Sequence, residues 1–169
     1  MSAEQVRETL QQYVEVLLAR GDYGRFFDDS IEFALMGTDQ QTRGAQAAEQ
    51  TIRFLHETAF DAAPELTNLV VDDHGAAAEA FFVGTHTGEF SGVSATGNPV
   101  RVPYSVFYDV GANKITALRI YMPMDQLLAQ IGGATEPDVA RCQGLRGRPE
   151  RQPRTRRNEL LHIARSGSP

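Results

Sequence analysis

Apolar residues recur every three or four positions in three segments of the chain, as they do on one face of an amphipathic helix. These segments are residues 3–20, with Ser2 as a candidate N-cap, residues 43–59 and residues 124–131. A shorter helical turn is expected at residues 23–28, between the first two helices. The pattern therefore predicts two long helices early in the chain and a short one near residue 130.

Apolar and polar residues alternate, or form short apolar runs, in the segments between and after these helices, which is typical of β-strands. The predicted strands are residues 31–36, 66–72, 76–90, 100–110 and 114–122. Glycine, asparagine and aspartate separate the last four, so we expect an antiparallel meander. The order α-α-β-α-β-β-β-β plus a short C-terminal helix favours an α+β fold over a parallel βαβ sheet.

Charge divides the chain of 169 residues into two parts. Residues 1–132 hold 8 Lys and Arg against 18 Asp and Glu, whereas residues 133–169 hold 8 against 4 and are rich in Arg, Pro and Gly. We interpret residues 1–132 as one domain and residues 133–169 as a disordered tail. Because the domain is acidic, nucleic acid is not expected as a partner.

The sequence lacks the features expected of membrane, disulfide-bonded, metal-binding and nucleotide-binding proteins. There is no apolar run of about 18 residues and no basic-then-apolar leader, so we expect no membrane association and a cytoplasmic location. The single cysteine, Cys142, cannot form an internal disulfide. The four histidines lack metal-ligand spacing, and no phosphate-binding loop is present, so neither a metal nor a cofactor is expected.

The block Thr85-His86-Thr87-Gly88-Glu89-Phe90, followed by Ala95-Thr96-Gly97, has the character of a family signature. With Arg119-Ile120-Tyr121 and the closing segment at residues 127–132, it resembles the SnoaL-like polyketide (ester) cyclase branch of the nuclear transport factor 2-like superfamily. The resemblance implies a cone, in which a curved antiparallel sheet wraps around the N-terminal helices and encloses an apolar pocket. It also implies a homodimer formed through the sheet.

The resemblance places known acid/base positions on this chain, and most of them are apolar. The catalytic aspartate and histidine of the aldol cyclases fall on Ile120 and Val106. The base, acid and tyrosine of the ketosteroid isomerase-like enzymes fall near Ala34, on Val106 again and on Tyr13. An apolar side chain cannot carry a proton, so the known mechanisms cannot run unchanged from these positions.

Strand alternation predicts which residues line the pocket once Val106 and Ile120 face inward. The expected ligand-binding residues are Met36, Val106, Tyr108, Leu118, Ile120 and Met122, with Tyr104 on the same face. Such a wall suits an apolar small molecule that carries a few oxygens. The alternative is that these residues simply fill a core.

Tyr13, His86 and Tyr104 are the candidate catalytic residues, because a phenol or an imidazole can handle protons where the carboxylates are missing. His86 and Glu89 are three apart and fall on opposite faces of a regular strand, so they are not expected to act as a pair. Tyr13 could instead be a packed core residue, and His86 a structural hydrogen-bonding group.

The sequence leaves two classes of function open. The first is a cofactor-independent cyclase or isomerase acting on a polyketide-like or other oxygenated apolar molecule by acid/base proton transfer. The second is a non-catalytic small-molecule binding module with the same pocket. Epoxide hydrolysis is a weaker alternative, because it requires carboxylates inside the pocket and the pattern places none there.

Overall fold

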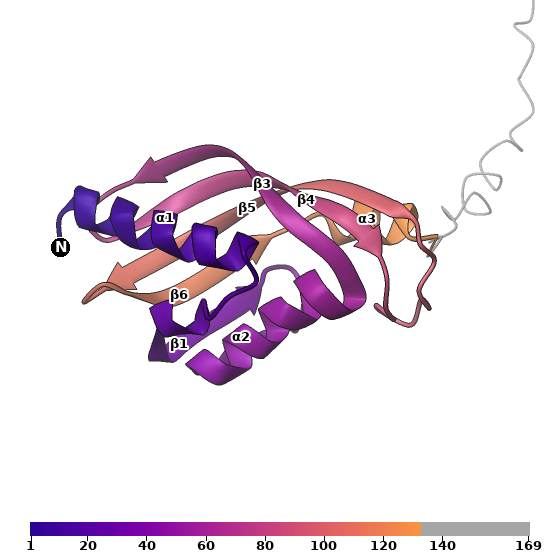
Figure 1. Cartoon of the computed structure of the whole chain (residues 1–169), viewed down its shortest axis with the longest axis horizontal. Helices are drawn as coiled ribbons and strands as arrows, with labels where there is room; N and C mark the ends of the chain where they lie inside the picture. The colour runs from indigo at the N-terminus through magenta and orange to yellow at the C-terminus, as the bar shows by residue number, and fades with distance from the viewer. Residues whose placement is uncertain (133–169) are drawn as a thin grey trace, which may run out of the picture. The chain divides into compact units, whose positions relative to one another are not determined.

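The computed structural model describes residues 1–132, and the tail predicted at residues 133–169 lies outside the described residues. In chain order the elements are α1 (Ala3–Leu18), η1 (Gly24–Phe26), β1 (Phe27–Leu35), β2 (Gln41–Arg43), α2 (Ala45–Arg53), η2 (Phe54–Ala59), β3 (Phe60–Val71), β4 (Gly75–His86), β5 (Pro99–Gly111), β6 (Lys114–Tyr121) and α3 (Met124–Gln130). Figure 1 shows α1 lying across the sheet and α2 below it, and both helices contribute to the same hydrophobic cluster.

The six strands form one sheet in the order β2-β1-β6-β5-β4-β3. β1 pairs with β6 in parallel, whereas every other neighbouring pair is antiparallel. The sheet is therefore mixed: β2 follows β1 and pairs with one side of it, and the chain reaches the other side of β1 only with β6. Register shifts at Leu66/Asn68 and at Asp109/Val110 mark bulges, which bend strands and help the sheet to curve. The predicted α+β cone is confirmed.

The first helix begins where its sequence predicts. The Ser2 side chain accepts a hydrogen bond from the Gln5 backbone N–H, and the Gln5 side chain accepts one from the Ser2 backbone, which completes a capping box. Val6, Leu10 and Tyr13 form the buried face of α1. This face packs against the concave side of the sheet, so α1 brings Tyr13 into the interior.

The segment predicted as one helix over residues 43–59 has three parts. A short strand, β2, precedes α2, and α2 continues into the π-helical turn η2. Strand β3 starts at Phe60, six residues earlier than predicted, and includes Pro64. Proline is tolerated there because β3 is an edge strand and Pro64 has no second neighbour that needs its missing N–H.

Two hydrophobic clusters fill the interior. One joins α1, α2 and the middle of the sheet, and the other surrounds Phe60, Phe82 and Phe90 beside α3. Tyr104 packs against both clusters. Among residues 1–132, no helix has the length and apolar character needed to span a bilayer.

Candidate functional site

An interior cavity of about 50 Å³ lies where the two hydrophobic clusters meet. Its wall comes from α1, β1, α2, η2, β4, β5, β6, α3 and the connections beside them. The lining residues are Tyr13, Leu17, Leu35, Ile52, Leu55, His56, Phe82, Phe90, Tyr104, Val106, Tyr108, Leu118, Ile120, Met122, Met124 and Leu127. Among residues 1–132, the wall holds three phenols and one imidazole but no carboxylate.

Seven of the nine predicted site residues line this cavity. They are Tyr13, Tyr104, Val106, Tyr108, Leu118, Ile120 and Met122. Val106 and Ile120 are cross-strand partners, as are Tyr108 and Leu118, so alternation along β5 and β6 turns all four inward. Their roles in binding or catalysis remain predictions.

Met36 does not line the cavity, contrary to its predicted place. It follows β1, where Leu35 takes the inward position, and alternation turns the next side chain away. Met36 instead lines a hollow on the opposite side of the sheet with Ala34 and Arg119. Ala34, near which the resemblance put a base, is therefore also outside the interior cavity.

His86 is fully buried but also lies outside the cavity wall. Its Nδ1 accepts a hydrogen bond from the Thr96 backbone N–H at 3.3 Å, and its own backbone bonds Gly97 and Asn98. Its ring packs on Phe60, with 5.2 Å between the ring centroids. These contacts hold the loop before β5 onto the end of β4, as a structural role for His86 requires. Its Nε2 is buried without a hydrogen-bond partner among residues 1–132, and its catalytic role remains a prediction.

The three phenols of the wall are held in their protonated form. Burial raises the pKa of Tyr104 to about 12 and moves the pKa values of Tyr13 and Tyr108 well above the usual tyrosine range. Within residues 1–132, no protein group hydrogen-bonds to any of the three hydroxyls. Tyr13 and Tyr108 lie with their ring centroids 6.0 Å apart, so α1 and β5 bring two phenols together.

His56, in the π-helical turn η2, is the cavity residue that the sequence interpretation missed. Its Nδ1 lies 3.2 Å from the Ala62 carbonyl oxygen. Since a carbonyl can only accept, Nδ1 must carry the hydrogen, and in the neutral ring Nε2 keeps its lone pair. Burial lowers the pKa of His56 below its usual value, against the weaker raising effects of this hydrogen bond and of Glu57. The half-buried His56 ring is therefore favoured in its neutral form, in which the Nε2 lone pair can accept a proton.

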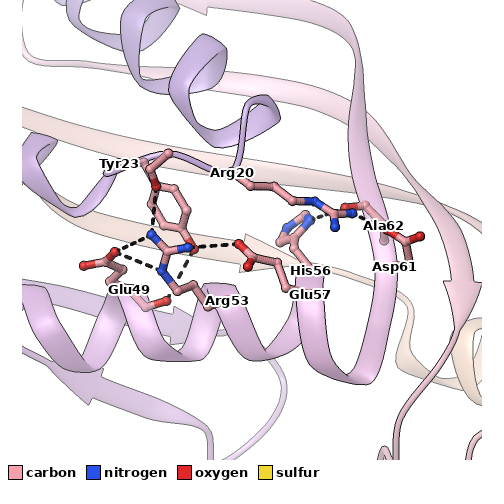
Figure 2. A network of polar contacts seen from close by, with 9 residues as sticks. Arg20, Tyr23, Glu49, Arg53, His56, Glu57, Asp61 and Ala62 are labelled. Carbon is pink, nitrogen blue, oxygen red and sulfur yellow. Dashed lines mark hydrogen bonds and ion pairs between the residues drawn. The ribbon is translucent and has the colours of Figure 1, made fainter.

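A polar network holds the turn that carries His56 (Figure 2). Arg53 binds Glu49 and Glu57 on its own helical segment and donates to the Gly21 carbonyl oxygen at 2.8 Å. The Arg53 guanidinium also lies over the Tyr23 ring, 4.8 Å from its centroid. Beside His56, Arg20 forms an ion pair with Asp61. These contacts tie η2 to the segment after α1 and to β3, and so fix where the imidazole sits.

One signal in the sequence could have found His56. It lies four residues after Ile52, on the apolar face of the predicted helix, which faces the interior. No group of three potential metal ligands occurs among the residues that the structure describes. The three phenols and the imidazole of the wall can transfer protons and form hydrogen bonds.

The curved sheet, the helices on its concave face and the interior cavity define the class of protein: an α+β cone of the nuclear transport factor 2-like type. The family model for SnoaL-like polyketide cyclase matches residues 7–131, so the chain belongs to this family. No curated protein matches it significantly. The family is one of cyclases, and solved structures with the same fold include isomerase-like proteins.

Solved structures at low sequence identity share the fold. A protein from Jannaschia sp. CCS1 described as a SnoaL-like polyketide cyclase is 18% identical, with a TM-score of 0.70 over 78% of this chain and 94% of that one. TsrD from Streptomyces laurentii is 22% identical, with a TM-score of 0.63 over 76% and 98%. A protein from Kribbella flavida described as a ketosteroid isomerase is 19% identical, with a TM-score of 0.55 over 72% and 79%.

Proposed function

We propose that the chain is a cofactor-independent cyclase- or isomerase-type enzyme that moves protons on an apolar, oxygenated small molecule. The observation that carries the proposal is the neutral imidazole of His56 in a wall that also holds three protonated phenols. A base and hydrogen-bond donors in one apolar cavity are the groups needed to remove a proton next to a carbonyl.

The proposed reaction uses these groups in a fixed order. His56 Nε2 takes a proton from the carbon next to a ketone, and the C–H electron pair moves to form an enolate. Phenol hydroxyls, with Tyr13 and Tyr104 as candidates, donate hydrogen bonds to the enolate oxygen. The enolate carbon then attacks an internal carbonyl, which closes a ring, or the proton returns at another carbon, which isomerises the molecule. Protonated His56 gives its proton to the new alkoxide oxygen after ring closure, or to the other carbon in the isomerisation, so the overall reaction needs no oxidant or reductant.

The cavity must widen for a ligand to bind. Its volume of about 50 Å³ is far below the roughly 300 Å³ or more of common small-molecule pockets. Leu55, Met122 and Met124 in the wall have side chains that are partly buried, and methionine adapts readily to a new shape. Ligand entry therefore requires these side chains to change rotamer.

The alternative is a binding module with the same pocket, and one observation favours it. Val106 and Ile120 lie in the cavity at the positions where the resemblance puts the family's acid/base groups, and both are apolar. Epoxide hydrolysis lacks similar support, since no carboxylate lines the cavity in the described part of the chain. The two remaining classes differ in whether bound ketone exchanges protons.

Deuterium exchange of 2-tetralone separates these classes without knowledge of the natural substrate. This apolar bicyclic ketone carries acidic C–H groups next to its carbonyl, and their exchange in D₂O can be followed by proton NMR. We expect the protein to accelerate the exchange well above the buffer rate. A pocket that binds 2-tetralone without accelerating exchange would instead identify a binding module.

Replacing Tyr13 with phenylalanine is expected to slow this exchange by about 10- to 100-fold, because one donor to the enolate oxygen is removed. Folding should stay intact, since no protein group within residues 1–132 bonds the Tyr13 hydroxyl. Tyr121→Phe is the matched control, because Tyr121 is 46% exposed on the outer face of the sheet. An unchanged exchange rate in Tyr13→Phe would remove Tyr13 from the proposed mechanism.

We also propose that the outer face of the sheet forms a homodimer contact. Phe107 and Tyr121 are 43% and 46% exposed there, with 5.7 Å between their ring centroids, and they form an apolar pair on adjacent strands. Sedimentation velocity is expected to show a dimer that Phe107→Glu converts to a monomer. A monomeric wild-type protein would contradict the proposal.

A further inference from the structure

A second hollow lies on the surface between β2 and α2 and shares one wall residue with the interior cavity. It has a volume of about 490 Å³, and Leu55 lines both spaces. Leu55 is half-buried in η2 and directly precedes His56. A change in the Leu55 rotamer would therefore connect the outer hollow with the cavity that holds the imidazole. We call the outer hollow the amide groove.

The amide groove differs from the interior cavity in chemistry. Its polar residues are Asp39, Gln40, Gln41, Thr42, Gln50 and Thr51. Within the described part of the chain no lysine or arginine lines it, and its single charged group is a carboxylate. Amides and hydroxyls both donate and accept hydrogen bonds, so the amide groove suits neutral hydroxyl-bearing groups and disfavours anions.

Thr42 provides a second, independent sign of a polar occupant. Its Oγ1 is buried and has no hydrogen-bond partner within residues 1–132. A buried hydroxyl without a partner is costly, and a structure that keeps one invites an explanation. Thr51, by contrast, already donates to the Ala47 carbonyl oxygen at 2.9 Å. Thr42 lines both the amide groove and the hollow beside Met36, so a ligand hydroxyl in the amide groove would satisfy Oγ1 once a rotation about χ1 turns it towards the groove.

We propose that the substrate is amphipathic, with an apolar ketone-bearing ring system in the interior cavity and a neutral polyhydroxyl or glycosyl substituent in the amide groove. The proposal rests on the proposed function, because it assumes that the interior cavity receives the reacting part. It adds what that function leaves open, which is the class of substituent and the side from which the ligand enters. Leu55 is the residue that ring and substituent both touch.

Two fluorescent probes test this substrate class directly. 2-Naphthol supplies the apolar ring alone, and 2-naphthyl β-D-glucoside adds a neutral polyhydroxyl group. The chain contains no tryptophan, so naphthyl fluorescence can be excited with little protein background. With two new hydrogen bonds in the amide groove, the glucoside is expected to bind the wild-type protein about three- to tenfold more tightly than 2-naphthol.

The ratio of the two dissociation constants is the quantity to follow in variants. We expect Gln50→Ala and Thr42→Val each to bring this ratio towards one, whereas Gln126→Ala, at an exposed glutamine on α3, keeps the wild-type ratio. Thr42→Val removes the unpartnered hydroxyl and nearly preserves the shape of the side chain, so we expect this variant to fold like the wild-type protein.

Each outcome decides between the two proposals. If 2-naphthol binds but the glucoside binds no more tightly, or the ratio is insensitive to Gln50→Ala and Thr42→Val, the amide groove is not a substrate site and the interior cavity stands. If 2-naphthol does not bind at all, the interior pocket itself fails and this inference falls with it. Preferential binding of 2-naphthyl sulfate over the glucoside would overturn the neutral-substituent class.

Discussion

Replacing His56 with glutamine is expected to lower the rate of 2-tetralone deuterium exchange by about 100- to 10,000-fold, the usual contribution of a positioned general base. Nε2 of His56 is the basic atom, since Nδ1 is committed to the Ala62 carbonyl oxygen at 3.2 Å. A glutamine amide can still donate to that carbonyl but cannot accept a proton from carbon. The substitution therefore removes the base and leaves the local hydrogen bond available.

His74→Gln is the matched control for this variant. His74 lies in the turn between β3 and β4 with 86% of its side chain exposed, and it does not line the cavity. Exchange by His74→Gln should equal that of the wild type, and both variants should keep the wild-type circular dichroism spectrum. Full exchange activity in a folded His56→Gln variant would show that His56 is not the base.

The pH dependence of the exchange rate provides a second readout of the same residue. The pKa of His56 lies below its usual value of 6.5 because burial disfavours the charged ring. The neutral base therefore persists below pH 6.5, and the inflection of the rate profile should fall on the acid side of that value. In the same range the unfolded chain binds a proton that the folded chain resists, so the folded state loses stability as pH falls below 6.5. An inflection above pH 6.5 would assign the titration to another group.

The fold followed from the sequence wherever one face of an element is buried and the other is not. Helix α1 and the strands β5 and β6 have this two-faced pattern, and their predicted segments agree with the structure to within two residues, whereas β4 ends at His86, four residues before its predicted end. The start of β3 was missed because Phe60-Asp61-Ala62-Ala63-Pro64 combines a proline with small residues, which argues against an internal strand. That stretch is a strand because it forms the sheet edge and pairs along its length with β4.

The pocket wall could be predicted from alternation, but the position of the base could not. Val106 and Ile120 face inward as cross-strand partners, a relation fixed by the period of two in each strand. The apolar face of the predicted helix includes His56, but where its ring lies depends on the change from α2 into a π-helical turn, which no local pattern specifies. His86 lies in a block that resembles a family signature, and the structure places it against Thr96 and Phe60 outside the cavity wall.

Replacing Phe60 with alanine is expected to lower the free energy of unfolding by about 3–5 kcal/mol, the usual cost of deleting a buried aromatic side chain. Phe60 is fully buried where η2 ends and β3 begins. Its ring contacts Phe82, His86 and Phe90, with centroid distances of 5.3, 5.2 and 5.2 Å. Phe60 therefore joins β4 and the following loop to the turn that carries His56. Its removal leaves a cavity that the neighbouring side chains cannot fill completely.

Urea denaturation of Phe60→Ala and of Phe54→Ala gives the comparison. Phe54 begins the same π-helical turn but is 43% exposed, so its removal should cost about 1 kcal/mol or less. If both variants lose the same small amount, the cluster around Phe60 does not stabilise the fold as its contacts indicate. If Phe60→Ala alone is strongly destabilised, the contacts of Phe60 with His86 and Phe90 stabilise the end of η2, which is the turn that carries His56.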